Sequence, residues 1–329
     1  MIPITLHIEE FLCNYLVQQR GLSPHTIDSY AYSFLLLFEF AAKKHRIAPT
    51  ALMVEHLDST LISDFLEDLE KTRQNSADTR NIRLAAIRSF FRFLEYRLPA
   101  RLEQIRRILA IPFKKTDTRL VHFLNQEEIQ ALLDAPDPTT RIGIRDRAML
   151  HVAICAGLRV SELVGLQIKD VGPLHKSILI HGKGRRERTL PLWKVTTTTL
   201  QAWLDIRGRA TTPGVFINAQ GESMTRWGFA YVLKRHVNAA IGGCPSLSKK
   251  RVSPHVLRHA CAMMVLQATQ DIRKVSLWLG HSNLETTEIY TRADPSEKLE
   301  AIEAMVPPHL RKGVFHPPDK LLAMLRSPK

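Results

Sequence analysis

Residues 253–260 read SPHVLRHA, a short stretch that contains two histidines and one arginine at helical spacing. Pro254 can occupy the first turn of a helix, where an amide hydrogen has no intrahelical partner. His255 and Arg258 are then three positions apart and project from the same helix face. Together they can donate hydrogen bonds to the non-bridging oxygens of one phosphate group. The stretch therefore predicts a helix that carries an anion-binding pair.

The same stretch also has the spacing of a helical zinc pair, because His255 and His259 are four residues apart. The zinc peptidase pattern requires a glutamate directly after the first histidine, and this chain has Val256 there. The four cysteines are scattered and form no CxxC pair: Cys13, Cys155, Cys244 and Cys261. We therefore predict no metal and no cofactor, and interpret the cysteines as structural thiols in a reducing cytosol.

The stretch AGLRVSEL predicts a junction between two helices, the first ended by Gly157 and the second begun by Ser161. Arg159 lies at this junction, where a guanidinium group can be held rigidly. An arginine stays charged at any useful pH, so it is suited to stabilising negative charge. The alternative is a purely structural salt bridge with Glu162 or Asp170.

A β-hairpin is predicted over residues 177–192, with strands at 177–180 and 188–192. Lys183 lies between two glycines at the turn. A lysine there can reach into a DNA groove, and desolvation can bring its pKa into the range of a general acid. The alternative is a solvated turn lysine. A phosphate-binding P-loop is excluded, because Gly184 stands where serine or threonine is required.

A further helix boundary is predicted in residues 279–292, LGHSNLETTEIYTR. His281 follows Gly280 there, and Ser282 can cap the next helix. Tyr290 is then nine residues after His281. A tyrosine on a helix is by itself typical of ordinary packing. The order and spacing of all these features together is what points to chemistry.

In this order the motifs resemble those of the tyrosine recombinase (phage integrase) family, and the resemblance covers nearly the whole chain. The similar stretches are AGLRVSELVGL, HGKGRRERTLPL, PHVLRHACA, LGHSNLETTEIYTR and, near the N-terminus, GLSPHTIDSYAYSF. The residues that correspond to the family's catalytic set are Arg159, Lys183, His255, Arg258, His281 and Tyr290.

The resemblance implies an enzyme that cuts and rejoins DNA strands without a metal or cofactor. Tyr290 would attack the scissile phosphate and become joined to the 3′ phosphate, while Lys183 protonates the leaving 5′ hydroxyl. His255 would assist proton transfer involving Tyr290. The non-bridging oxygens would be held by Arg159, Arg258 and His281. Because a phosphotyrosine retains the energy of the broken ester, the strands can be resealed without ATP.

The resemblance also implies the partners. Double-stranded DNA with short inverted core sites would bind four protomers, either identical or from related recombinases. These would exchange strands through a Holliday junction. We expect a bacterial cytoplasmic protein that is associated with the nucleoid and does not contact a membrane.

Charge and length agree with this interpretation. The chain of 329 residues is long enough for two domains. Its formal net charge is +14, of which residues 113–329 contribute +13. A basic surface of this kind is expected on a protein that binds a phosphate polymer. The longest apolar runs, such as residues 149–158, are too short to span a bilayer.

We predict a mostly α-helical fold with one small β-hairpin. Residues 1–110 form a helical core-binding (SAM-like) domain, residues 111–122 an extended basic linker, and residues 123–329 a mixed α/β catalytic domain. A tail begins at about residue 295. The resemblance implies that the two domains form a C-shaped clamp around DNA.

Helical periodicity supports this division. Four helices are predicted in the first domain, at about residues 5–20, 24–42, 59–71 and 78–96. Asn125 and Glu128 have the spacing of a capping box that begins the second domain. The basic residues that could contact DNA phosphates, or could simply be solvated, are Arg80, Arg83, Arg88, Arg92, Lys114 and Lys115.

The biological subtype is suggested by the ends of the chain. Because the sequence starts directly in the first domain, we expect a simple recombinase without the arm-binding domain of lambda-like integrases. The tail after Tyr290 is longer than is usual for a resolvase of Xer type. A mobile-element recombinase is therefore favoured over chromosome or plasmid dimer resolution.

Two rival classes of protein share some of these features, namely a type IB topoisomerase and a non-catalytic DNA-binding protein. The first domain and the tail after Tyr290 argue against the topoisomerase, and the complete catalytic set argues against a protein without activity. An apolar strip in residues 295–305 would pack on a neighbouring protomer or fold back onto its own domain.

Overall fold

The computed structural model describes residues 2–116, 122–182, 187–208, 210, 212–281 and 283–293. The chain divides into two compact units, Met1–Thr118 (the first unit) and Arg119–Lys329 (the second unit). Lys183, Ser282 and the tail from about residue 295 lie outside the described residues.

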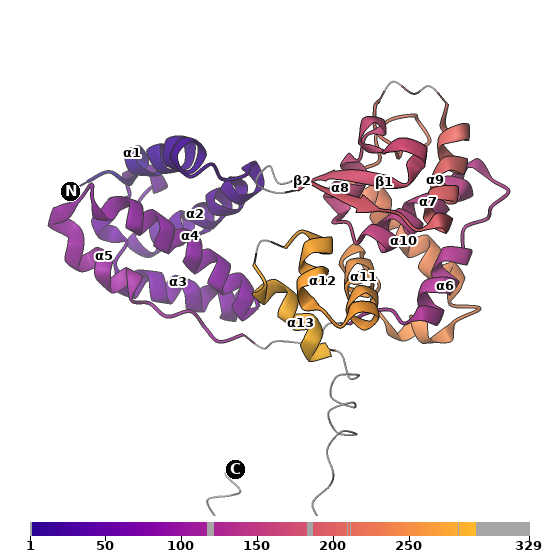
Figure 1. The fold of residues 1–329 in the computed structure, drawn as a ribbon. Helices are drawn as coiled ribbons and strands as arrows, with labels where there is room; N and C mark the ends of the chain where they lie inside the picture. The colour runs from indigo at the N-terminus through magenta and orange to yellow at the C-terminus, as the bar shows by residue number, and fades with distance from the viewer. Residues whose placement is uncertain are drawn as a thin grey trace, which may run out of the picture. The chain divides into compact units, whose positions relative to one another are not determined.

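The first unit is helical, as predicted (Figure 1). Its longer elements are α1 (Ile4–Glu9), a π-helix (Glu10–Gln19), α2 (Pro24–His45), α3 (Ser59–Lys71), α4 (Ala77–Glu95) and α5 (Leu102–Leu109). The sequence predicted the first two elements as a single helix and missed α5. The α5 segment has only eight residues, so its apolar periodicity is short.

Capping residues explain where these helices begin. Ser23 precedes Pro24 in extended conformation and begins α2, as predicted. The carboxylate of Asp58 accepts a hydrogen bond from the Leu61 amide at the start of α3. Ser76 caps α4, so this helix begins one residue before the predicted start. Aromatic rings then fill the core of the unit, with contacts among Phe11, Phe34, Phe90 and Phe93.

The second unit is also mainly helical, with one hairpin. Its elements are α6 (Gln126–Asp134), α7 (Arg141–Ala156), α8 (Val160–Gly165), β1 (Ser177–His181), β2 (Glu187–Pro191), α9 (Lys194–Arg207), α10 (Arg226–Ala240), α11 (Pro254–Thr269), α12 (Ile272–Leu279) and α13 (Glu285–Ala293). The two strands pair antiparallel in one register, with Ser177 opposite Pro191 and His181 opposite Glu187. The predicted hairpin is therefore confirmed. The predicted capping box is also present, because Asn125 and Glu128 exchange hydrogen bonds.

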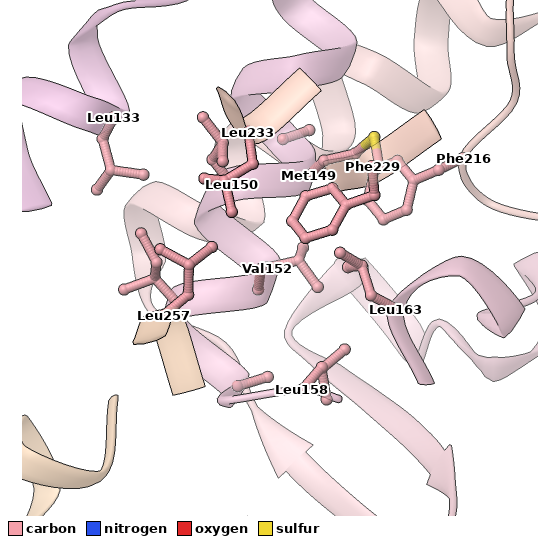
Figure 2. Packing of buried hydrophobic residues seen from close by; sticks show 14 of the residues in the cluster. Leu133, Met149, Leu150, Val152, Leu158, Leu163, Phe216, Phe229, Leu233 and Leu257 are labelled. Atoms are coloured by element: carbon pink, nitrogen blue, oxygen red, sulfur yellow. The ribbon is translucent and has the colours of Figure 1, made fainter. Parts of the chain in front are cut away.

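Helix α7 forms the centre of this unit and is buried along most of its length. It packs against α6, α8, α9 and α11. Figure 2 shows Met149, Leu150 and Val152 of α7 among side chains from the surrounding elements. Those labelled around them include Leu163, Phe216, Phe229, Leu233 and Leu257. Only residues 157–159 separate α7 from α8. The burial of α7 therefore fixes the position of the helix junction predicted around Arg159.

One predicted helix start is wrong. The helix after this junction is capped at Arg159, and Ser161 lies inside its first turn. The reason is that the Arg159 amide finds a hydrogen-bond acceptor in the Glu162 side chain, three residues later. Within the described residues, no helix is long and apolar enough to cross a membrane.

Two aromatic residues of α10 provide a test of this core. Phe229 is 1% exposed and Trp227 is 87% exposed. Phe229→Ala should lower the free energy of unfolding of the second unit by about 3–5 kcal/mol, through lost burial and a cavity. Trp227→Ala should change it by less than about 0.5 kcal/mol. Denaturant unfolding of both variants measures this, and equal losses would contradict the packing described.

Candidate active site

Arg159 and Glu162 form the first part of the site. Gly157 ends α7 with a φ of +58°, in the left-handed region that favours glycine. A Cβ at this position would also come within 2.8 Å of the Cys261 sulfur. After this tight turn, the Arg159 guanidinium donates to Glu162 Oε1 at 2.8 Å. The salt bridge considered from the sequence is therefore present, and its acceptor is Glu162.

A second arginine binds the same carboxylate. Arg188 of β2 donates from Nη1 to Glu162 Oε1 at 3.2 Å and from Nη2 to Oε2 at 2.9 Å. The Glu162 side chain is 5% exposed. Burial acts to raise the pKa of this carboxyl, but hydrogen bonds from Arg188 and the Arg159 amide, together with both positive charges, lower it overall. Glu162 is therefore ionised and joins the hairpin to the start of α8.

Arg258 is held by backbone carbonyl groups. Its Nη1 donates to Gly157 O at 2.6 Å and its Nη2 to Leu279 O at 2.7 Å. Nη1 also lies 3.9 Å from Glu162 Oε2. Burial and the nearby Arg159 charge lower the pKa of Arg258 to about 10, so it remains a cation at neutral pH. Its two carbonyl contacts connect the C-terminal ends of α7 and α12 to α11.

His281 follows directly after α12. Gly280 ends this helix with a φ of +65°, and a Cβ there would lie 2.9 Å from Arg188 Nη1. The His281 Nδ1 is 2.8 Å from the hydroxyl of Thr287, which is fully buried. Burial and the charge of Arg258, followed by those of other nearby cations, lower the pKa of His281 to about 4. The ring is therefore neutral at pH 7. When Thr287 donates to Nδ1, the other ring nitrogen carries the hydrogen and can act as a donor.

Tyr290 lies on α13, packs against buried residues of α11 and α12, and is 2% exposed. Helices α11, α12 and α13 pack against one another, as Figure 1 shows. The Tyr290 hydroxyl lies 2.9 Å from Nδ1 of His259. Burial raises the pKa of Tyr290 to about 12, although the charges of Arg258 and Arg159 act to lower it. The phenol is therefore protonated in the free protein.

The structure thus gathers most of the predicted catalytic residues. Tyr290 lies close enough to Arg159 and Arg258 for their charges to affect its pKa, and the same two charges affect the pKa of His281. His255 is exposed on the first turn of α11, and His259 lies against the tyrosine in its place.

The structure places at the site four further residues that the sequence did not predict as catalytic. They are Glu162, Arg188, His259 and Thr287. For Glu162 the sequence already suggested a salt bridge with Arg159, whereas the other contacts depend on how separate elements pack. Within the described part of the chain, no three His, Cys, Asp or Glu side chains are placed to hold a metal ion.

The hairpin that leads to Lys183 is attached to the body of the unit at its turn end. His181 Nε2 lies 3.0 Å from Oδ1 of Asp170, and His181 Nδ1 lies 2.9 Å from Oε1 of Glu187. Hydrogen bonds with Asp170 and Glu187 raise the pKa of His181. Asp170 is buried and also accepts from the Gln167 amide. The last residue of β1 is thereby fixed two positions before Lys183.

Arg80 and Arg83, which were predicted to contact DNA, have partners within the first unit. Arg80 is 7% exposed and donates to the carbonyl of Pro112. Arg83 donates to Ser33 Oγ at 2.9 Å and lies over the Tyr32 ring. Their contact with DNA stays a prediction, as does that of Lys114, which is paired with Glu70, and that of Lys115, which is exposed.

Other arginines of the first unit line an open cleft. Its volume is about 320 Å³, and its lining includes the guanidinium-bearing residues Arg20, Arg88 and Arg92. Aromatic residues complete the lining: Tyr15, Tyr30 and Phe113. Arg88 lies 4.9 Å from the centre of the Phe113 ring, which orients its planar group. Positive charge and aromatic surface are therefore combined in one cleft.

Comparisons with known proteins agree with this geometry. Residues 122–297 match the phage integrase family, and residues 8–97 match the N-terminal SAM-like domain of phage integrases. An integrase/recombinase of Sinorhizobium fredii, y4rC, is 43% identical over 323 residues, which cover 97% of each chain. Tyrosine recombinase XerC of Pelobacter propionicus is 33% identical over 93% of this chain and 97% of its own.

Solved structures share the fold. The post-cleavage complex of the XerH site-specific recombinase has a TM-score of 0.68 at 24% identity, covering 87% of this chain and 81% of its own. The Tn1549 transposon integrase, solved with a circular intermediate DNA, has a TM-score of 0.68 at 16% identity, covering 93% of this chain and 100% of its own. The chain therefore belongs to the phage integrase family of tyrosine recombinases, enzymes of site-specific DNA recombination.

The Glu162 carboxylate offers a pH-dependent test of the site. Glu162→Gln should lower the free energy of unfolding by about 3–5 kcal/mol at pH 7, because it leaves buried cations without their counter-charge. The folded pKa of Glu162 is lowered below its unfolded value of about 4.3, so its stabilisation is present above pH 4.3 and is lost as the pH falls through the folded pKa.

Denaturant unfolding of the wild type and the variant at neutral and acid pH measures this effect. The difference should shrink below about pH 4. Glu103→Gln, which removes an exposed salt bridge with Arg107, is the control and should change stability by less than about 1 kcal/mol. A deficit for Glu162→Gln that does not depend on pH would contradict the ionised, buried carboxylate.

Proposed function

We propose that Tyr290 is the nucleophile of the recombinase and forms a covalent bond to the 3′ phosphate of the cut strand. Arg159 and Arg258 bind the non-bridging oxygens of the scissile phosphate, and His281 donates a further hydrogen bond. Lys183 protonates the 5′ oxygen as it leaves. The observation that carries this proposal is the burial of the Tyr290 hydroxyl within the electrostatic range of both arginines.

The arrangement suits a reaction in which negative charge grows on a phosphate. Two guanidinium groups held by fixed partners are oriented before the substrate arrives, so little reorganisation is needed. Arg258 is fixed by two carbonyl groups and Arg159 by a carboxylate. A neutral His281 can donate a hydrogen bond without adding another positive charge to the site. These features support phosphoryl transfer to a protein side chain.

Removal of one oxygen tests the nucleophile. Tyr290→Phe should abolish covalent attachment to DNA and leave DNA binding nearly unchanged, because the ring still fills its buried site. The substrate is a nicked duplex that carries a core site selected by the wild-type protein from random-sequence DNA. Denaturing gels detect the covalent complex, and mobility shifts measure binding.

Tyr231→Phe is the matched control. Tyr231 is 68% exposed on α10, and its variant should form the covalent complex at the wild-type rate. A covalent band from Tyr290→Phe would eliminate Tyr290 as the nucleophile.

We also propose that residues 1–110 are a core-binding domain and that the open cleft of the first unit binds the DNA backbone. The cleft arginines lie on one side of α4 and beside the π-helix, with Arg92 and Arg20 exposed. Guanidinium groups bind phosphate oxygens well, and aromatic neighbours limit their motion. Residues 123–329 form the catalytic domain, and residues 111–122 connect the two.

The salt dependence of binding tests this cleft. The double variant Arg88→Ala/Arg92→Ala should weaken binding to any duplex, because two phosphate contacts are lost. Each contact contributes about 0.9 to the slope of log affinity against log salt, so the slope should fall by about 2. Fluorescence anisotropy of a labelled duplex at several salt concentrations measures the slope.

Arg106→Ala provides the control, since Arg106 is an exposed arginine of α5 that does not line the cleft. Its slope should equal that of the wild type. An unchanged slope in the double variant would exclude the cleft as a backbone contact.

The biological role that we propose is recombination of a mobile element, within the bacterial cytoplasm and on nucleoid DNA. Support comes from the relative named integrase/recombinase, which is 43% identical, whereas the XerC and XerD relatives are 31–33% identical. Assembly as a tetramer on two duplexes is expected, because a related lambda integrase was solved as a tetramer on a Holliday junction. Inverted repeats beside the gene would support this role, and a site at the replication terminus would favour dimer resolution.

A further inference from the structure

The contact between His259 and Tyr290 brings a second histidine of α11 to the reacting atom. His259 Nδ1 lies 2.9 Å from the Tyr290 hydroxyl, and the two ring centres are 5.6 Å apart. His259 immediately follows Arg258, which holds the phosphate in the proposed function. His255, which the family resemblance associates with this proton transfer, is exposed one helical turn earlier.

The protonation states of the two rings allow the Tyr290 hydroxyl to donate this hydrogen bond. Burial, followed by the charges of His255 and Arg258, lowers the pKa of His259 to about 4. The imidazole is therefore neutral at pH 7, while the phenol of Tyr290 is protonated. In the tautomer that carries the ring hydrogen on Nε2, Nδ1 accepts this hydrogen bond from the Tyr290 hydroxyl.

We propose that His259 accepts the phenolic proton of Tyr290 when the tyrosine oxygen attacks the scissile phosphate. This inference rests on the proposed function of Tyr290. As the bond from the tyrosine oxygen to phosphorus forms, the phenolic proton moves to Nδ1. The bond from phosphorus to the 5′ oxygen breaks, and that oxygen takes a proton from Lys183. In ligation, the 5′ hydroxyl gives its proton to Lys183 and attacks phosphorus. The bond from phosphorus to the tyrosine oxygen breaks, and Nδ1 returns its proton to that oxygen.

Geometry makes His259 a better acceptor than His255. A general base must lie within hydrogen-bond distance of the proton that it removes. His259 meets this condition in the free protein, through a contact between α11 and α13. The pKa of His259 is also lowered by the charges of His255 and Arg258 on its own helix. His281, which follows α12, lies close enough for the charge of His259 to lower its pKa.

The same electrostatics keep the tyrosine unreactive before DNA binds. Burial lowers the pKa of His259 and raises the pKa of Tyr290, so the ion pair is strongly disfavoured in the free protein. A bound phosphate places negative charge beside Arg258, which removes part of the repulsion that opposes protonation of His259. Proton transfer thus depends on the presence of the substrate.

The test compares His259→Asn with His255→Asn. Asparagine places an acceptor oxygen near the position of Nδ1 but cannot take the proton. The substrate is the nicked core-site duplex with a sulfur in place of the 5′ bridging oxygen, because a thiolate leaves without a proton from Lys183. Cleavage rates are measured from about pH 5 to about pH 10, and binding is measured in parallel.

His259→Asn should lower the cleavage rate at pH 7 by about 10²–10⁴. Its rate should then rise about tenfold per pH unit, since the phenol must ionise by itself. The wild type should lose activity only as the pH falls through the pKa of His259 in the complex, and should be level above it. Whatever its rate, His255→Asn should keep the shape of the wild-type profile, which is level above the pKa of His259 in the complex. His259→Gln, which carries its amide near the position of Nε2, repeats the comparison if the asparagine variant fails to bind DNA.

A level profile for His259→Asn at the wild-type rate would overturn the inference, and so would a rising profile for His255→Asn. In either case Tyr290→Phe still decides the proposed function separately, because it reports whether the covalent bond forms at Tyr290 at all.

Discussion

The buried carboxylate of Glu162 lies 2.8, 2.9 and 3.9 Å from the guanidinium groups of Arg159, Arg188 and Arg258. These arginines come from the start of α8, from β2 and from α11, so one negative charge connects three separate parts of the second unit. Three cations held this close together repel one another strongly where water is excluded. The Glu162 charge reduces that repulsion and orients the groups, and the remaining positive charge is available for a phosphate.

The burial of α7 provides the mechanical basis for this arrangement. Core packing fixes the end of α7. The chain then turns at Gly157, where a side chain would collide with Leu279 and Cys261. The Gly157 carbonyl accepts from Arg258, so the turn also determines where the second arginine lies. The packing of α7 in the core therefore determines the placement of Arg258 in the site, although Arg258 belongs to another helix.

Local signals predicted the parts of this protein, and tertiary contacts decided the rest. Ser23 with Pro24 and the capping pair at Asn125 each act within a few residues, so the helices that they begin were predicted correctly. The two strands predicted around Lys183 were also correct. Ser161 was wrongly predicted as a helix cap because the acceptor for the Arg159 amide is a side chain that faces the active site. The exchange of His259 for His255 beside Tyr290 depends on how α13 packs against α11. No sequence spacing within α11 contains that information.

Tertiary contacts also decide which arginines of the basic helix α4 are open to a phosphate, and periodicity alone does not contain this information. Arg80 and Arg88 both lie off the apolar stripe, yet Arg80 is bound to the carbonyl of Pro112 while Arg88 faces an open cleft. The segment after α5 accounts for this difference, because its Pro112 carbonyl binds Arg80 while its Phe113 ring lies beside Arg88 and lines the cleft. An arginine that has already satisfied its donors within the protein has less to gain from a phosphate. The phosphate-binding capacity of a basic helix therefore depends on which of its charges the rest of the domain leaves without a partner.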